Sequence, residues 1–249
     1  MSMQYYRFII GIQLNKKMFR LSSSSGLLVD EILNLRDTEK KIGEDYFTQI
    51  GISNNPDDLY VSFSNEDKSN TLLIKSDQIV FKKTAIDNVA AVVSDKAHQE
   101  FEILWKKADG ILSFPAVRRI GMVGELRIDE SGKNSAANEL VKRLVKINPP
   151  EHSGRFQLTY ENKRLKNDGS VPDKETDDYW NTIYTYYLSE HDETPVSGKI
   201  NANIDVQKYY NPAKSNPLAE LKKVKSQFAK EKSAFKTSLS ELGFSKNGK

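Results

Sequence analysis

The sequence predicts an α+β fold in which a mostly antiparallel, curved sheet of about eight strands carries helices on one face. Three observations lead to this class. Short segments rich in β-branched and aromatic residues alternate between apolar and polar positions, which is typical of half-buried strands. Asn, Asp, Ser and Pro separate neighbouring segments and favour turns between adjacent antiparallel strands. Other segments repeat apolar residues every three or four positions, as amphipathic helices do.

The first half of the chain opens on a strand over residues 5–14, whose apolar side chains alternate onto one face. A serine run then leads into an amphipathic helix, GLLVDEILNLR, and we expect one of the serines to be its N-cap. Three further strands are predicted, over residues 46–53, 59–64 and 71–83. Ser76 and Asp77 indicate a bulge in the last of them. A second helix begins at Ser94 or Asp95 and ends before Pro115.

The second half repeats this order. Four strands are predicted, over residues 118–128, 155–163, 179–190 and 198–210. A helix through AANELVKRLVKI follows the first of them. A long final helix has Asn216 as its N-cap, Pro217 at its first position and Gly243 after its end. Gly121 and Gly124 lie inside a predicted strand, where glycine suggests a bulge or the close approach of a helix.

Both halves, 1–112 and 113–249, therefore have the order strand, helix, three strands, helix. This repeated order indicates an internal duplication as a hypothesis. Each half alone would bury only a small core, so we predict that the two share one sheet and form one compact unit. The same order occurs in TATA-binding-protein-like and helix-grip folds, an analogy of fold that implies no function.

Composition removes several kinds of chemistry. The chain has no cysteine, which excludes disulfides, thiolate zinc sites, iron–sulfur clusters and cysteine nucleophiles. Its three histidines are scattered, without the spacing of metal ligands. No apolar stretch reaches the roughly 18–20 residues that a membrane helix needs, and the N-terminus has the pattern of a strand rather than a signal peptide. We therefore expect a soluble, cytoplasmic protein with no membrane partner.

One set of residues keeps an enzymatic alternative open. Restriction-type nucleases hold magnesium between an acid at one strand end and a Glu-x-Lys pair on the neighbouring strand. Asp129 ends one predicted strand, and Glu161 and Lys163 share a face of the next. Solvated strand ends are the simpler interpretation. The sequence contains neither a Gly-x-Ser-x-Gly nor a His-Glu-x-x-His motif, so we expect no cofactor, and Mg²⁺ only under the nuclease alternative.

The strand over residues 179–190 is a candidate binding surface. It carries Trp180, Tyr184 and Tyr186 on one face, and tyrosine and tryptophan are enriched at protein interfaces. Acidic residues flank the strand and argue against base stacking with a nucleic acid. We expect this strand to contact a protein partner or a second copy of the chain.

The last helix is the other candidate surface. The segment from Asn211 to Lys249 holds nine lysines against three glutamates, within a chain whose net charge is only +3. Phe228 and Phe235 belong to an apolar stripe, and Lys222, Lys223 and Lys230 lie outside it. Packing of the stripe across the sheet is the simpler interpretation. Docking onto a partner, or contact with nucleic acid through the lysines, are the alternatives.

Four segments together resemble a sporadically distributed prokaryotic family of α+β proteins of similar length. They are the Trp105 helix, the strand RRIGMVGELRI, the strand NIDVQKYY and the closing helix with Phe228 and Phe235. The resemblance spans most of the chain, although the opening strand lacks the family's proline-containing start. Patchy distribution implies residence in mobile or antiviral-defence gene clusters. No catalytic residue is carried over, because the family has no catalytic motif that matches here.

We therefore expect a non-catalytic binding or assembly component, of a prokaryotic defence or mobile-element system. It would engage a protein partner or itself through its sheet and C-terminal helix. One alternative is the metal-dependent nuclease described above. The other is a binder of small apolar ligands, with a pocket between the curved sheet and the long helix.

Overall fold

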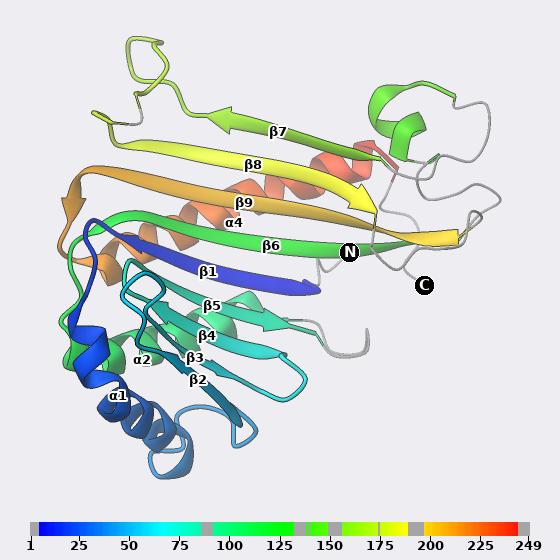
Figure 1. Ribbon diagram of the computed structural model, residues 1–249. Coiled ribbons are helices and arrows are strands. Elements are labelled where there is room, and N and C mark those ends of the chain that lie inside the picture. Colours follow the sequence, from blue (N-terminus) through cyan, green and yellow to red (C-terminus); the bar gives the residue numbers. More distant parts are fainter. Residues whose placement is uncertain are drawn as a thin grey trace.

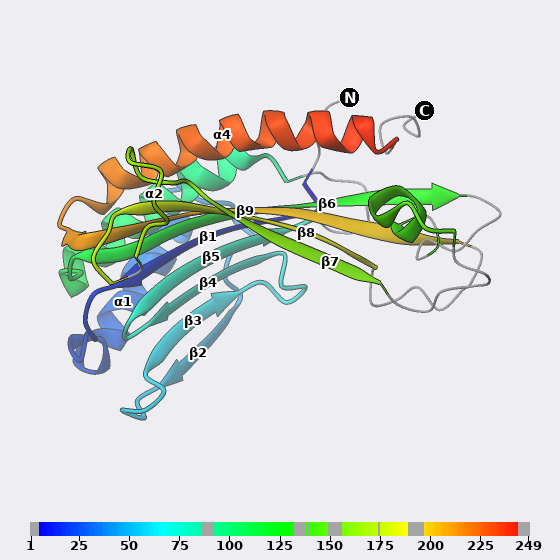
Figure 2. The same cartoon turned by 90° about the horizontal axis from the view of Figure 1, so that it is seen from above.

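The computed structural model describes residues 5–85, 92–131, 138, 140–148, 156–173, 175–188 and 197–243. These residues form an open, nine-stranded antiparallel sheet with helices packed on one face (Figure 1). Figure 2 shows α2 and α4 on the same side of the sheet, and β2 and β3 at the edge that bends away from α4. The predicted α+β class with a curved antiparallel sheet is confirmed, with nine strands rather than about eight.

The elements follow one another with these bounds: β1 (Arg7–Leu14), α1 (Arg20–Asp37), β2 (Gln49–Ser53), β3 (Tyr60–Ser64), β4 (Asn70–Lys75), β5 (Gln78–Thr84), α2 (Ser94–Leu112), β6 (Val117–Ser131), a short π-helical segment (Val141–Val145), β7 (Gln157–Lys163), β8 (Tyr179–Leu188), β9 (Ser197–Lys214) and α4 (Pro217–Glu241). Across the sheet the strand order is β2-β3-β4-β5-β1-β6-β9-β8-β7. None of the helices that the structure describes is both long and apolar enough to cross a membrane.

The antiparallel pair β1–β6 lies where the two halves of the chain meet. Gly11 of β1 faces Gly121 of β6, and the pairing continues on both sides of these glycines. Outward from this pair, the first half adds β5, β4, β3 and β2, and the second half adds β9, β8 and β7. Both halves therefore contribute to one sheet. Their origin by duplication stays a prediction.

Three predicted elements differ from the structure. The helix predicted through AANELVKRLVKI lies partly outside the described residues, and its described part contains the short π-helical segment Val141–Val145. The first helix begins at Arg20, so the serine run lies inside it and supplies no N-cap. The hydroxyls of Ser23 and Ser25 instead donate to the carbonyls of Arg20 and Ser22, at 3.1 and 3.4 Å. Leu21 explains the earlier start, because it is fully buried with the apolar stripe of the same helix.

The predicted strand over residues 71–83 is a hairpin of two strands, β4 and β5, and Ser76 and Asp77 form its turn rather than a bulge. Backbone hydrogen bonds hold this turn against the rest of the fold. The Met18 amide donates to the Ser76 carbonyl at 2.6 Å, and the Leu14 amide donates to the Asp77 carbonyl at 2.8 Å. These partners are distant in sequence, so the local pattern did not reveal them.

The core lies between the sheet and its helices. Alternate residues of the strands are buried on this side, as the period of two requires. In the first half α2 packs against β1, and α1 packs against α2 and β3; in the second half α4 packs against β6 and β9. The ends of α4 are as predicted: the Asn216 side chain accepts from the Ala219 amide at 3.2 Å, Pro217 follows it, and Gly243 adopts a φ of 79°.

Gly124 allows α4 to approach β6 closely. A Cβ atom at this position would lie 2.8 Å from Cζ of Phe228 and would also collide with the ring of Tyr5. Gly121, on the opposite face of the same strand, has room: a Cβ there would meet its nearest neighbour, Cγ of Gln207, at 3.6 Å. The expected close approach of a helix is thus found at one of the two glycines.

We predict that Gly124→Ala lowers the free energy of unfolding by about 1–3 kcal/mol, because the added methyl group overpacks the contact between α4 and β6. Gly121→Ala in the same strand is the matched control and is expected to change stability much less. Urea unfolding of both variants checks this. Equal losses in the two variants would contradict the proposed role of Gly124.

Candidate functional site

The candidate site lies on the face of the sheet that none of the described helices covers, which we call the helix-free face. Ile204 and Val206 of β9 are buried on the α4 side, so the residues between and beside them point the opposite way. On β6, β9 and β8 the helix-free positions are occupied by Arg119, Gly121, Val123, Glu125, Arg127, Asn201, Asn203, Asp205, Gln207, Tyr209, Tyr179, Asn181, Ile183, Thr185 and Tyr187.

A cavity of about 130 Å³ opens over the two central glycines. Gly11 and Gly121 face one another across β1 and β6 and carry no side chains, so the register itself leaves the space. Its apolar wall includes Ile9, Val80 and Val123. Its polar wall is formed by Gln13, Gln78, Arg119, Asp205 and Gln207.

Asp205 lies in a largely apolar position on this face. Its lateral neighbours in the sheet are Val123 on β6 and Ile183 on β8. One carboxylate oxygen, Oδ2, accepts a hydrogen bond of 2.6 Å from Nε2 of Gln207. Burial raises the pKa of the Asp205 carboxyl above its ordinary value, and the Gln207 bond and the charge of Arg119 lower it by less.

Arg119 lies on the other side of the glycine row, within a group of aromatic side chains. Its guanidinium lies 5.7 Å from the ring centre of Tyr209, and Nη1 donates to the Tyr209 hydroxyl at 3.4 Å. The Tyr209 ring stacks on Tyr179, with 4.5 Å between ring centres and 4° between planes. The Tyr209 hydroxyl in turn donates to Oε1 of Gln207 at 2.7 Å. A connected network therefore runs from Arg119 to Asp205.

A second polar group lies beside this network. Glu125 is only 3% exposed and forms an ion pair with Arg7, which faces it directly across β1 and β6. Tyr187 of β8 lies close enough to be influenced by both charges; its pKa rises to about 12, chiefly because of burial. The charged partner of Glu125 is thus a cross-strand arginine.

The proposed nuclease residues do not come together. Asp129 lies on β6, whereas Glu161 and Lys163 lie on β7, and β9 and β8 intervene. At about 4.8 Å between neighbouring strands, the two positions are too far apart to share a metal ion. The Glu161 carboxylate instead accepts from Asn181 at 2.5 Å and lies 3.5 Å from Lys163. The nuclease alternative requires Asp129 and the pair Glu161 and Lys163 to lie on neighbouring strands. They do not, so we do not propose a nuclease.

The aromatic residues expected to meet a partner lie inside the fold. Phe228 packs 5.5 Å from Phe8, and Phe235 packs 5.4 Å from Tyr184 and 5.8 Å from Tyr186, measured between ring centres. These contacts fill the space between α4 and the sheet, where a pocket for apolar ligands was the other alternative. Packing of α4 across the sheet, the simpler interpretation, accounts for these side chains.

The remaining expected partner residues keep their exposure only in part. Trp180 is half-buried on the helix side, where Lys208 lies 5.3 Å from its ring centre. Lys222, Lys223 and Lys230 are exposed on the outer face of α4. Of these three, Lys223 pairs with Glu220 at 2.7 Å.

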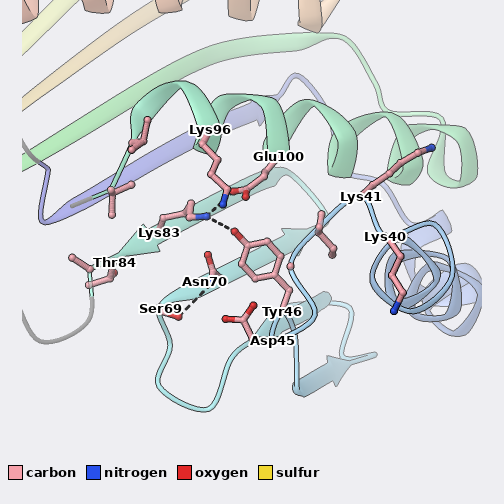
Figure 3. A pocket seen from close by; sticks show the side chains of 15 residues that line it. Lys40, Lys41, Asp45, Tyr46, Ser69, Asn70, Lys83, Thr84, Lys96 and Glu100 are labelled. Carbon is pink, nitrogen blue, oxygen red and sulfur yellow. Dashed lines mark hydrogen bonds and ion pairs between the residues drawn. The ribbon is translucent and has the colours of Figure 1, made fainter. Parts of the chain in front are cut away.

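A larger pocket, of about 580 Å³, lies beside α2 (Figure 3). Nζ of Lys83 donates to the Tyr46 hydroxyl and lies 2.6 Å from Oε2 of Glu100. These side chains come from β5, the α1–β2 connection and α2, so the cluster ties α2 to the sheet. In Figure 3, Lys40 and Lys41 point away from this cluster. Lys96 points toward Glu100 in the same view, beside Lys83. The four lysines of this pocket therefore do not converge on one point, and we interpret the cluster as structural.

Sequence reasoning missed Asp205, Gln207, Arg119 and the glycine pair as a site. The signal was present in NANIDVQKYY, where polar residues alternate with Ala202, Ile204 and Val206. This alternation indicates a strand with one polar face. The sequence could not show that Gly11 lies opposite Gly121, which is what creates the cavity.

We predict that Glu100→Ala lowers the free energy of unfolding by about 3–5 kcal/mol, because it leaves Lys83 buried without its carboxylate partner. The side chains of Lys83 and Glu100 are only 15% and 8% exposed. The surface pair Lys75–Asp58 is the matched control, and Asp58→Ala is expected to cost far less. Urea unfolding of the Glu100→Ala and Asp58→Ala variants measures both losses of stability. Equal costs would show that the buried pair contributes no more than a surface pair.

We predict that Asp205→Asn stabilises the fold at neutral pH. A carboxyl whose pKa is raised by folding contributes less stability as the pH rises above its unfolded value, and the neutral amide removes this loss. The gain should appear as the pH rises above the ordinary carboxyl range and vanish in acid. Asp177 is the control, because Lys166 lowers its pKa and Asp177→Asn should have the opposite sign. Unfolding curves over a pH series test both.

The chain matches no protein-family model and no curated protein.

Proposed function

We propose that this chain is a non-catalytic binding component that holds a protein partner on the helix-free face of its sheet. The observation that carries the proposal is the composition of this face. Its central positions on β6, β9 and β8, from Arg119 to Arg127, Asn201 to Tyr209 and Tyr179 to Tyr187, include two arginines, three tyrosines and three asparagines, of which Tyr179, Asn181 and Asn201 are buried. Lysines on this face, such as Lys82 of β5 and Lys163 of β7, lie outside this central region.

This composition is typical of the centre of a protein interface. Arginine and tyrosine are enriched there, whereas lysine is depleted, because the ammonium group is costly to dehydrate. The outer face of α4 has the opposite character, with Lys222, Lys223, Lys230 and Lys236 all exposed. The contrast favours the sheet over the helix as the partner surface.

The side chains of the helix-free face are also held in place before a partner arrives. Tyr209 is stacked on Tyr179 and bonded to Gln207, and Gln207 is bonded to Asp205. Ordering such groups in advance lowers the entropic cost of binding. The proposal thus keeps the expected assembly role and moves the contact surface from the buried aromatic side chains to this network.

The test is affinity purification of the tagged full chain from cells that naturally express it, with quantification of co-purifying proteins. Asn203 lies in the middle of the helix-free face, between Glu125 and Thr185. We predict that Asn203→Arg and Thr185→Arg each reduce a stoichiometric partner by about tenfold or more, because they place a bulky charge at the centre of the contact.

Lys230→Glu on the outer face of α4 is the matched control and should retain the partner. Light scattering of the purified chain at several concentrations shows whether the partner is a second copy. The proposal fails if the chain is a strict monomer that co-purifies with nothing. It also fails if Lys230→Glu removes the partner while both sheet variants, shown by circular dichroism to be folded, retain it.

A further inference from the structure

We infer that the cavity over Gly11 and Gly121 is a binding site for a small zwitterion, with the ligand's ammonium group at Asp205 and its carboxylate at Arg119. The inference rests on the cavity itself and does not require the protein partner proposed above. A free amino acid of a few heavy atoms is the chemical class that it fits.

The register places the two charged groups on opposite sides of the glycine row. Val123, Gly121 and Arg119 are alternate residues of β6 and share the helix-free face. Asp205 lies beside Val123, and Gln207 lies beside Gly121. Successive positions on one face of a strand are about 6.6 Å apart, so Asp205 and Arg119 are separated by roughly two such steps, with the cavity between them.

Neither charge forms a direct ion pair within the described part of the chain, although the charge of Arg119 acts on Asp205 across the cavity and lowers its pKa slightly. Oδ2 of Asp205 accepts from Gln207, whereas Oδ1 takes no hydrogen bond from another described residue. Arg119 gives one long hydrogen bond, of 3.4 Å, to the Tyr209 hydroxyl, and it forms no ion pair with another described side chain. Two half-buried charges that are held apart compensate one another only weakly, and a ligand that lies between them can give each a direct partner.

A ligand with both charges suits this site better than one with a single charge. A lone cation at Asp205 would meet the positive field of Arg119, and a lone anion at Arg119 would meet the negative field of Asp205. A zwitterion pairs with both groups and adds no net charge. The cavity volume of about 130 Å³ corresponds to about four water-sized groups, at about 30 Å³ each, which sets the size of the ligand.

The glycines keep the space open. A Cβ at Gly121 would lie 3.6 Å from Cγ of Gln207 and 3.7 Å from Oδ1 of Asp205, so a larger side chain would occupy the cavity. At Gly11 a Cβ would meet no atom within 4 Å, because this position opens directly into the same space. Gly121→Val is therefore a steric block that leaves both charged groups in the sequence.

The test is a titration of the ¹⁵N-labelled full chain with glycine, β-alanine and γ-aminobutyrate, followed through the amide signals of Gly11 and Gly121. This series varies the distance between ammonium and carboxylate. We expect saturable shifts with at least one member. Methylammonium and acetate each carry only one of the two charges. Each should bind at least about tenfold more weakly than the best zwitterion.

Asp205→Asn and Arg119→Gln should each weaken the best zwitterion by about tenfold or more, and Gly121→Val should abolish its binding. The dispersion of the amide spectrum shows that each variant is folded. The inference is overturned if no zwitterion gives a saturable shift, if methylammonium binds as well as the zwitterions, or if Arg119→Gln has no effect. Asn203→Arg separates the two proposals, because it should lose the protein partner and still bind the zwitterion.

Discussion

Seven residues of β1, from Arg7 to Gln13, pair in one register with β6, and this ladder joins two half-sheets that no other ladder in the strand order connects. Its register fixes both faces at once. Gly11 meets Gly121 on the helix-free side, while Ile10 and Met122 meet on the helix side. A slip of one residue would exchange the two faces. The core and the cavity are therefore consequences of the same pairing.

The two sides of β6 show how one strand serves two purposes. On the helix side, Gly124 lets Phe228 and Tyr5 approach the backbone, so the missing side chain improves packing. On the helix-free side, Gly121 leaves space unfilled beside Asp205, a carboxyl that burial makes unfavourable to ionise. A feature that costs stability is a candidate for function, because packing alone gives no reason to keep it. Gly124 therefore serves the packing of α4 on β6, whereas Gly121 leaves the space in which we propose that a ligand binds.

Much of the architecture followed from periodicity and turn residues, including all but one of the strands and the ends of α4 set by Asn216, Pro217 and Gly243. The β4–β5 hairpin was missed because its turn is held by Met18 and Leu14, far away in sequence. Of the residues expected to meet a partner, Phe228, Phe235, Tyr184 and Tyr186 are buried, because they pack between α4 and the sheet. The sequence identifies aromatic side chains that favour protein contacts, whereas only the packing of α4 on the sheet shows that these side chains are covered within the chain.

The long separation within the β1–β6 ladder has a consequence for biosynthesis. β1 can pair with β5 once residue 84 has left the ribosome, but its other edge stays unpaired until β6, more than 30 residues later in the chain, has emerged as well. During that interval a nascent first half presents an open strand edge, which is a template for pairing with a second chain. When several ribosomes translate the same mRNA, nascent chains lie close together. This would favour domain-swapped dimers, in which β1 of one chain pairs with β6 of another.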